Sequence, residues 1–524
     1  MESVTTLLDQ WYWHGIQATT LFNHTMIISS LLLIFFSVLF YKLNTTTAPK
    51  LNLPPSPPKL PIIGNIHQLG THLHRSLQGL SDKYGPLILI YMGSNSPTLI
   101  VSSPEIAREI MKSHDSVFQN RPQVMAADVL FYGCSDVAFS PYGEYWRQMK
   151  KICVLELLSL RRVQAFQFLR EEEVALMVEE IRRGCKEDGA DHVLDLGEMF
   201  TTLSNNIGSR SALGRKYEDG NNVSFGDLSK KAMELMGTFN FGDFFPYLRW
   251  IDVVTGYNAK VRNTAKAFHA LLDQVIDEHQ QQSSTDQSDK KDLVDILLQI
   301  QKEGQLGINL TRENLKAILL DMFIGGTDTT ATTMEWAMAE LVKNPSKMKM
   351  VQEEVRRVVG NKREVDEADI DQMMYLKCIV KETLRLHAPV MVTRKSWSSV
   401  NSKLEGYDIP PKTKVLINAW AIQRDPKLWE RPEVFVPERF MNNQVDFKGH
   451  HKQFIPFGAG RRGCPGMTFA VVEAEYVLAC LLYWFDWRLP PGEKVEDFDM
   501  TDVFKPIIRK RMPLRLVPVL HSTC

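Results

Sequence analysis

The chain has 524 residues with a formal net charge of −1, and 44% of its residues are apolar. This apolar content is ample for a large core, and the near-neutral charge gives no reason to expect nucleic acid as a partner. The seven cysteines are scattered, with no C-x-x-C pair and no cysteine–histidine cluster at zinc spacing. The sequence therefore argues against a zinc site and favours a reducing compartment for the main body.

An apolar run begins at Thr25 and ends at Tyr41, about 17 residues, which is the short end of what a membrane-spanning helix needs. No lysine or arginine precedes it, whereas lysines follow at positions 42, 50 and 59. The positive-inside rule predicts a single-pass anchor at residues 25–41, with residues 1–24 in the lumen and the rest in the cytosol. A cleaved signal peptide is the alternative. It is disfavoured because a basic n-region is missing and the run lies too far from the first residue.

Residues 42–61 are basic and proline-rich, which predicts a semi-rigid hinge between the anchor and the main domain at residues 62–524. Within that domain, Trp146 and Lys150 share one face of a predicted helix. The segment 237–252 is dense in aromatic residues. It is either ordinary core or a lid over a substrate entrance near the membrane.

One long helical pattern runs from Thr311 to about Lys343, where Asn344-Pro345 stops it. Its middle, residues 325–330, holds two glycines and three threonines, and each glycine costs about 1 kcal/mol relative to alanine in a helix. The pattern predicts that another interaction offsets this weakness.

The weak section has a helical geometry of its own. Gly325, Gly326 and Thr329 are three and four residues apart, so they point to one side and form a groove with a single hydroxyl at its edge. Such a groove would fit a small ligand. Asp328 lies one residue further round, placed to relay protons rather than to touch the ligand. A kinked core helix is the alternative interpretation.

Further along the chain, Glu382 and Arg385 stand at i, i+3, which taken alone indicates an exposed ion pair. A Pro-Glu-Arg-Phe sequence later contributes Arg439. Between them, Arg394 and Lys395 place two cations in the segment that follows the predicted helix of Glu382.

The glycine-rich loop 454–466 contains Cys464, and an almost wholly apolar segment, 467–484, follows it. That segment predicts a buried helix, so the cysteine lies at a helix N-terminus, where backbone N–H groups and the helix dipole stabilise a thiolate. A structural cysteine is one interpretation. Nucleotide binding is another, because residues 458–463 match G-x-G-x-x-G, but no βαβ unit follows. Axial ligation of a haem iron is the third.

The loop completes the pattern Phe-x-x-Gly-x-Arg-x-Cys-x-Gly with Phe457, Gly460, Arg462, Cys464 and Gly466. This pattern resembles the haem-binding signature of the cytochromes P-450. The other features follow the order of that family: the anchor, the hinge, the groove at residues 325–329, Glu-x-x-Arg and Pro-Glu-Arg-Phe. In the family, the groove takes part in oxygen activation. The whole chain resembles plant A-type microsomal members of specialised metabolism.

The resemblance implies a mainly α fold with a small β region, the cytochrome P-450 fold, preceded by a transmembrane helix. Residues 62–524 would then be a catalytic domain that binds haem b, with Cys464 as the axial ligand of the iron. The other cofactor-binding residues implied are Arg462, Phe457, Gly458, Gly460, Gly466, Trp146, Lys150 and Arg394.

The resemblance also assigns roles outside the haem loop. Thr329 and Asp328 would deliver protons, and Glu382, Arg385 and Arg439 would form a buried structural triad. The residues implied to line the substrate pocket are Phe323, Gly325, Gly326, Val390, Val392, Val503 and Phe504.

Three positions depart from the family pattern. Lys150 stands where arginine is usual, and Lys505 stands where glycine is common. The arginine expected to hold a propionate falls on Ser396 in a gap-free alignment. Either Arg394 or Lys395 reaches the propionate, or Arg394 points at the substrate. These displaced cations suggest an acidic or strongly polar substrate.

The expected activity is an NADPH- and O2-dependent monooxygenase that oxidises a small lipophilic plant metabolite such as a terpenoid or alkaloid. Electrons would come from a separate NADPH–cytochrome P-450 reductase, with cytochrome b5 as a further candidate partner. The expected location is the endoplasmic reticulum membrane, in contact with lipid. A haem-thiolate isomerase or dehydratase that works without reductase is the alternative, disfavoured by the intact Asp328-Thr329 pair. A haem sensor is a third class. The substrate itself stays open.

Overall fold

The computed structural model describes residues 24–41, 51–93, 96–113, 117–187, 192–216, 225–282, 291–304, 308–396, 402–504 and 507–521. They belong to two compact units. The smaller unit is Met1–Leu53 with Gly406–Asp408, and the larger unit is Pro54–Glu405 with Ile409–Cys524. The expected lumenal segment 1–24 lies outside the described residues except for its last residue, as does the first part of the hinge, residues 42–50.

The smaller unit contains the predicted apolar helix, which runs from His24 to Tyr41 with a mean hydropathy of 2.0 and could span a membrane. Its three serine hydroxyls each donate to the carbonyl oxygen four residues earlier, at 2.6–2.8 Å. These bonds satisfy polar groups that a hydrocarbon environment would leave without partners. The helix covers the apolar run 25–41 and begins one residue before it.

The larger unit is mainly helical, as the sequence predicts. Its helices are α2 Leu73–Tyr84, α3 Pro104–Arg108, α4 Met125–Leu130, α5 Glu144–Lys151, α6 Leu160–Ala165, α7 Gln167–Glu187, α8 Leu196–Leu213, α9 Phe225–Gly237, α10 Phe241–Phe244, α11 Arg249–Val254, α12 Tyr257–Gln282, α13 Leu293–Glu303, α14 Arg312–Lys343, α15 Pro345–Val359, α16 Met374–His387, α17 Ala419–Ile422 and α18 Met467–Trp484. A π-helical turn, Ile152–Leu157, follows α5.

The described strands are short. They are β1 Leu87–Tyr91, β2 Pro97–Val101, β3 Leu194–Asp195, β4 Val392–Ser396, β5 Ser402–Leu404, β6 Tyr407–Ile409, β7 Lys414–Asn418, β8 Phe485–Arg488, β9 Asp502–Phe504, β10 Ile508–Lys510 and β11 Arg515–Leu520. The largest sheet has the order β1-β2-β7-β4, in which β2 and β7 are parallel and the other pairs antiparallel. The sheet β3-β11-β8 and the hairpin β9–β10 are separate from it.

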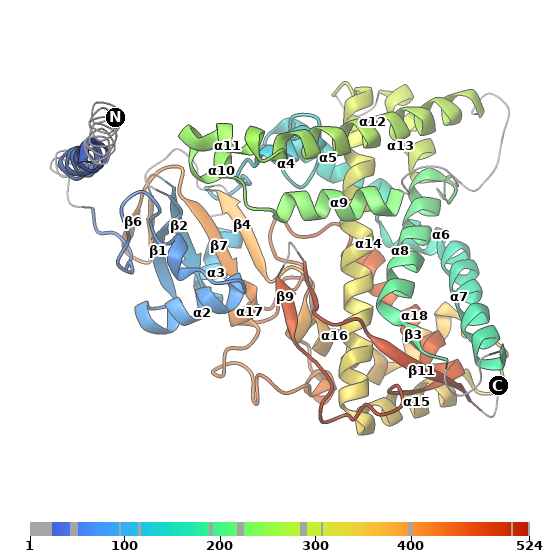
Figure 1. Ribbon diagram of the computed structural model, residues 1–524. Coiled ribbons are helices and arrows are strands. Elements are labelled where there is room, and N and C mark those ends of the chain that lie inside the picture. The colour runs from blue at the N-terminus through green and yellow to red at the C-terminus, as the bar shows by residue number, and fades with distance from the viewer. Residues whose placement is uncertain are drawn as a thin grey trace, which may run out of the picture. The chain divides into compact units, whose positions relative to one another are not determined.

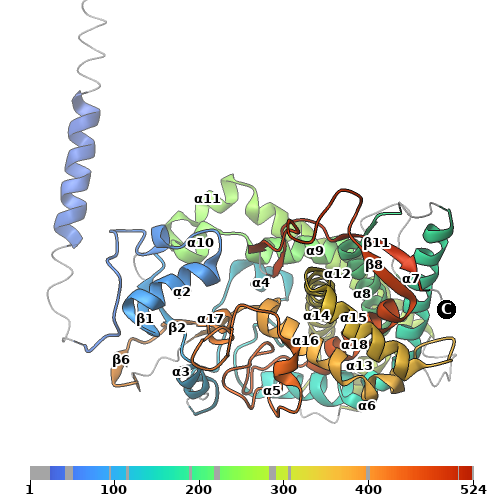
Figure 2. The same ribbon diagram turned by 90° about the horizontal axis from the view of Figure 1, so that it is seen from below.

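Helix α14 is the central element of the larger unit. It begins at the cap Thr311, whose hydroxyl accepts from the Asn314 N–H, and it ends at Asn344, before the proline that opens α15. Figure 1 shows α14 crossing the unit, with the sheet β1-β2-β7-β4 to one side and α8 to the other. Figure 2, which looks roughly along α14, shows α8, α16 and α18 around it, and all three pack against it. The predicted bounds of this helix are confirmed.

One expected pairing is wrong. The sequence indicates a hairpin between residues 406–410 and 415–420, but β7 has β2 on one edge and β4 on the other. With both edges occupied, β7 has no free N–H and C=O groups left for a neighbour in sequence. A hydrophobic pattern identifies a buried strand but does not identify its partners.

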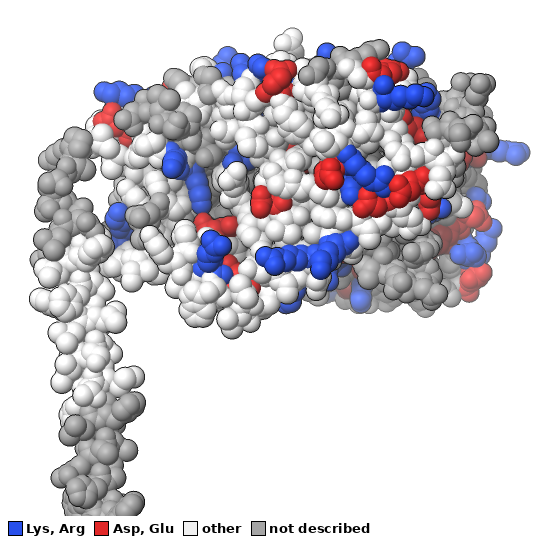
Figure 3. All heavy atoms as spheres, turned by 90° about the horizontal axis from the view of Figure 1, so that it is seen from above, with Lys and Arg blue, Asp and Glu red and all other residues white. Residues whose placement is uncertain are grey.

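The charges of the larger unit agree with its near-zero balance. In Figure 3, acidic and basic side chains are interspersed over one face, between wide areas of uncharged residues.

Candidate functional site

The cysteine loop is a tight structure in front of α18. The Cys464 N–H donates to the Phe457 carbonyl oxygen at 3.0 Å. Gly458 and Gly460 have φ values of 70° and 71°, in the left-handed region that glycine enters at no steric cost. The helix begins at Met467, so the cysteine precedes its first turn, as predicted.

The Cys464 sulfur is enclosed by protein and still reachable. Burial raises the pKa of the thiol, while the Gly466 and Met467 N–H groups and the Lys150 ammonium lower it. The side chain is nevertheless exposed to solvent. A ligand can therefore reach the sulfur.

The predicted cations and tryptophan gather beside this loop. Lys150 Nζ donates to the Gly463 carbonyl oxygen at 2.6 Å. The Arg462 guanidinium lies 4.2 Å from the ring centroid of Trp146, and the Trp146 Nε1–H donates to the Val137 carbonyl oxygen at 3.0 Å. Helix α5 therefore places Trp146 and Lys150 on the side that faces the cysteine loop.

Arg462 is buried, with 8% of its surface exposed. It donates to three backbone carbonyl oxygens, those of Gln119 at 2.8 Å, Val137 at 3.1 Å and Ser140 at 2.6 Å. The chain thus holds a permanent positive charge in the interior, two residues before the thiol. Such a charge is suited to a carboxylate such as a haem propionate.

Helix α14 is buried along most of its length, but one face of its middle is open. The accessible residues are Asp321, Met322, Gly325, Gly326 and Thr329, which we call the open stripe. The residues between them are buried. A Cβ added at either glycine would meet no atom within 4 Å. Because the spacings of three and four residues put all five on one side of a helix, the stripe faces open space.

The sequence predicts three of these five positions. Asp321 and Met322 were missed, although each stands four residues before one of the glycines and therefore shares its face. Extending the helical period by one turn would have found both.

The two predicted catalytic residues are fixed by different partners. Thr329 Oγ1 donates to the Gly325 carbonyl oxygen at 2.7 Å. Asp328 is buried, and one of its carboxylate oxygens lies 2.7 Å from Nη2 of Arg509 in β10. The sequence gave no sign of this arginine, because the contact joins segments about 180 residues apart.

The predicted pocket residues are divided between two places. The segment before β4, which includes Val390, meets the hairpin β9–β10, since the Ile508 N–H donates to the Pro389 carbonyl oxygen at 2.9 Å. Val503 and Phe504 form part of that hairpin, and Val392 lies in β4. Phe323 instead lies in the core, 1% exposed, with its ring centroid 4.0 Å from that of Phe225.

Arg394 and Lys395 lie in β4 opposite Leu416 and Val415, but their side chains and that of Ser396 lie outside the described residues. So does Lys505.

The structure brings the three residues of the predicted triad together in the interior. Both Glu382 oxygens accept from Arg385, each at 2.8 Å, and Oε1 also accepts from Arg439 Nε at 3.0 Å. Glu382 and Arg385 are fully buried.

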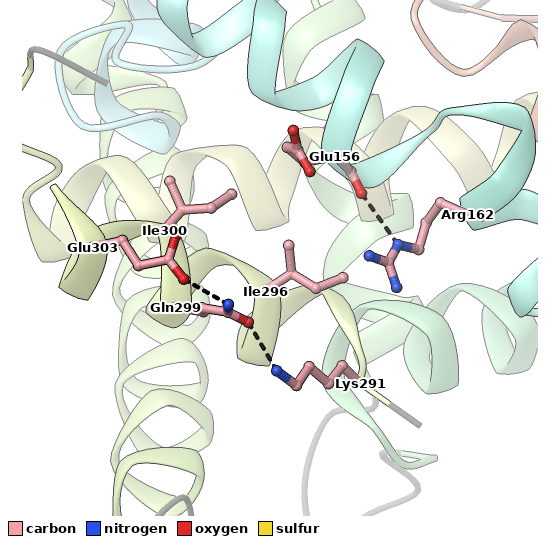
Figure 4. Close-up of a pocket in the computed structure, with 7 residues that line it drawn as sticks. All are labelled: Glu156, Arg162, Lys291, Ile296, Gln299, Ile300 and Glu303. Atoms are coloured by element: carbon pink, nitrogen blue, oxygen red, sulfur yellow. Dashed lines mark hydrogen bonds between the residues drawn. The ribbon is translucent and has the colours of Figure 1, made fainter. Parts of the chain in front are cut away.

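A further hollow lies between the segment Glu156–Arg162 and α13 (Figure 4). Its polar side chains bond to one another or to the backbone: Lys291 to Gln299, Gln299 to Glu303, and Arg162 to the Glu156 carbonyl oxygen. Neither the cysteine loop nor the open stripe lines it.

The residues around Cys464 fit a thiolate-ligated haem. An accessible thiol, a buried arginine and an open glycine face are each suited to such a group. A family model described as Cytochrome P450 matches residues 54–514. The chain is a cytochrome P450.

Curated relatives extend the match over nearly the whole chain. Phenylacetaldehyde oxime monooxygenase of Prunus mume is 49% identical over 99% of this chain and 100% of that protein. Cytochrome P450 71A1 of Persea americana is 52% identical over 87% and 91%. Desmethylyatein synthase of Sinopodophyllum hexandrum is 48% identical over 94% and 99%. This cytochrome P450 is thus a monooxygenase of the plant type with a haem-iron cofactor.

The two glycines of the open stripe provide a matched pair of variants. Gly325→Ala and Gly326→Ala should each raise the free energy of unfolding by up to about 1 kcal/mol, because alanine favours a helix and its Cβ meets nothing. Residues 325–330 resemble the oxygen-activation motif of this family, Ala/Gly-Gly-x-Asp/Glu-Thr-Thr, which accepts alanine at the first position and glycine alone at the second. We therefore expect Gly325→Ala to keep its turnover and Gly326→Ala to lose most of it, measured as product formed per haem. Full turnover in Gly326→Ala would show that this face does not border the reacting groups.

Proposed function

We propose that this cytochrome P450 uses NADPH and O2 to hydroxylate, or otherwise oxidise, a small lipophilic plant specialised metabolite such as a terpenoid or an alkaloid. The proposal is carried by the open stripe, an accessible face on an otherwise buried helix. One relative is named for phenylacetaldehyde oxime and another for desmethylyatein. Because these compounds differ, we assign neither of them as the substrate of this chain.

When bound, a haem with a thiolate ligand supplies the O2 chemistry that is general to cytochromes P450. Cys464 would ligate its iron, and a coordinated thiol gives up its proton. The glycines Gly458, Gly460 and Gly466 would let the backbone approach the group closely, and Phe457 would help to hold it.

Arg462 would hold a propionate, with Trp146 and Lys150 beside it. The role of Arg394, toward a propionate or toward the substrate, belongs to the proposal as well. In each case a cation meets a carboxylate in the interior, where the interaction is stronger than in water.

Protons would be held and moved by Thr329 and Asp328. The Thr329 hydroxyl donates its own proton to the Gly325 carbonyl oxygen, so its lone pairs are free to accept a hydrogen bond from a water or a ligand on the open stripe. Asp328 lies on the buried side, with one of its carboxyl oxygens 2.7 Å from Nη2 of Arg509. In this pair, Thr329 would position the proton that is delivered, and Asp328 would supply the next proton.

Electrons would come from NADPH through a separate cytochrome P450 reductase, with cytochrome b5 as a second candidate donor. The proposed docking face comprises Lys150, Lys151, Arg461 and Lys448. Lys151 and Arg461 are exposed and the Lys448 side chain is 62% exposed, whereas Lys150 is half-buried against the cysteine loop. Exposed cations on the thiolate side would attract an acidic partner.

We also propose the endoplasmic reticulum membrane as the location, with residues 1–24 lumenal, 25–41 as the anchor, 42–61 as a hinge and 62–524 as the cytosolic catalytic domain. In the larger unit, part of the segment that the sequence marks as core or lid is exposed: Tyr247 is 91% exposed and Trp250 57%. Apolar side chains this exposed favour contact with lipid over a place in the core.

Reconstitution tests the activity. The full chain in microsomes would be supplied with NADPH, ¹⁸O2 and a panel of terpenoids, alkaloids, phenylpropanoids and amino-acid-derived oximes, with and without reductase. We expect a product that carries ¹⁸O and forms only with reductase. In Thr329→Ala the yield of product per NADPH should fall about tenfold or more, because proton delivery is disturbed.

Thr330→Ala is the matched control. Thr330 is buried and its hydroxyl donates to the Gly326 carbonyl oxygen at 2.7 Å, so its loss should leave product per NADPH unchanged. Turnover of a hydroperoxide without NADPH would instead support a haem-thiolate isomerase or dehydratase, and the monooxygenase proposal would fail.

A further inference from the structure

Two carboxyl groups lie next to each other at the start of the open stripe. Asp136 precedes α5 in sequence and is fully buried, whereas Asp321, on α14, is partly accessible. Asp321 accepts from the Val137 N–H and Asp136 accepts from the Phe139 N–H, so both carboxyl groups contact the same turn. Asp136 Oδ1 finds no N–H or O–H donor among the described residues, as expected for an oxygen that faces another carboxyl group. Two acceptors form a hydrogen bond only when a proton lies between them.

The surroundings of the pair favour retention of that proton. Burial raises the pKa of both carboxyl groups, and backbone N–H groups of the segment 136–139 act in the opposite direction. Arg462 also lowers the pKa of Asp136. The other titratable groups that sense the pair are Cys134, Tyr145 and Cys153. Burial raises the pKa of each of these three, so they stay neutral near pH 7.

The pair also organises the turn 136–140. Asp136 Oδ2 accepts from the Phe139 N–H at 3.0 Å, and Asp321 Oδ2 accepts from the Val137 N–H at 2.5 Å. The same turn presents the Val137 and Ser140 carbonyl oxygens to Arg462. A chain of hydrogen bonds thus runs from α14 through the turn to the arginine of the cysteine loop.

We propose that Asp136 and Asp321 share one proton and act together as positioning residues, locking the turn 136–140 and its contacts with Arg462 onto α14, so that haem is held less firmly once the proton is lost. The part of this proposal that concerns haem retention rests on the function proposed above. The shared proton itself does not.

The sign of the pH dependence follows from the direction of the pKa shifts. In the unfolded chain an aspartate titrates near pH 3.9. The folded pair keeps a proton above that pH because burial raises its pKa. Its contribution is complete below about pH 4 and is lost as the pH rises through the raised pKa of the pair. Loss of the proton places two like charges in contact, which opens the lock.

The test uses the full chain, loaded with haem in detergent, and measures transfer of haem to apomyoglobin between pH 6 and pH 9. Wild type should release haem about tenfold faster at the upper end, where the hydrogen bond is lost. Asp136→Asn and Asp321→Asn each replace the shared proton by an amide N–H at the same net charge. We expect both variants to show a flat profile.

Asp128→Asn is the matched control, since Asp128 is exposed on α4 nearby and should leave the wild-type profile unchanged. Any effect of pH on the bond between Cys464 and the haem is common to all variants and cancels in the comparison. An asparagine variant that follows the wild-type profile would overturn the role in haem retention.

Infrared difference spectra between pH 6 and pH 9 test the proton without reference to haem. A protonated carboxyl C=O band should disappear at high pH in wild type and be missing from Asp136→Asn. The same band in both proteins would overturn the shared proton itself.

Discussion

Replacing Cys464 by histidine should abolish the strongly red-shifted Soret band that the reduced protein shows with carbon monoxide, and with it all monooxygenase turnover. The measurement is the carbon-monoxide difference spectrum of microsomes that contain wild type or Cys464→His. The expected effect is complete because thiolate ligation determines the band and no other group can replace the sulfur. Histidine can still ligate a haem iron, so the variant separates loss of the thiolate from loss of haem.

The position of the sulfur explains why it cannot be replaced. The Gly466 and Met467 N–H groups and Lys150 all favour its thiolate form. An imidazole at the same place is neutral when it binds a metal, so these donors would face no negative charge.

Cys185→Ser is the matched control. Cys185 is only partly buried, and its sulfur lies 3.5 Å from the Pro518 carbonyl oxygen. The carbon-monoxide difference spectrum of Cys185→Ser should show the same red-shifted band as wild type. A red-shifted band that persists in Cys464→His would require a different ligand, and no band in folded wild type would mean that the haem interpretation has to be withdrawn.

The sequence could predict the parts of the site that depend on local spacing. The cap Thr311 and the stop Asn344-Pro345 delimit α14 to within one residue, because capping and proline act on their own neighbours in the chain. The same reasoning locates Cys464 at the start of α18. A helix period also shows which residues share a face, and one more turn of it would have added Asp321 to the open stripe.

Contacts between distant segments could not be predicted in this way. Arg509 reaches Asp328 from β10, and the Val137 N–H, next to Asp136, reaches Asp321 across a separation of 184 residues. No periodicity encodes which buried charges meet, since many pairings satisfy the same pattern of hydrophobic residues. The partners of β7 were mistaken for the same reason: strand pairing is decided by tertiary packing.

The buried triad leads to the second large effect, on stability rather than chemistry. Glu382→Ala should lower the free energy of unfolding by about 3–5 kcal/mol, the usual cost of removing one partner from a buried ion pair. Arg385 would stay fully buried without a carboxylate, and Arg439 would lose the same partner. Urea unfolding of the detergent-solubilised protein, followed by tryptophan fluorescence, measures the change.

Glu353→Ala is the matched control, because Glu353 and Lys349 form an ion pair at 3.8 Å whose side chains are 66% and 78% exposed. Exposed ion pairs contribute little to stability, so this variant should unfold at the same urea concentration as wild type. Glu382→Gln should fall between the two, since an amide keeps one acceptor for the guanidinium groups and loses the charge. If Glu382→Ala unfolded at the same urea concentration as Glu353→Ala, the triad would contribute no more than a surface pair. The stability of the region between α16 and the cysteine loop would then have to come from packing alone.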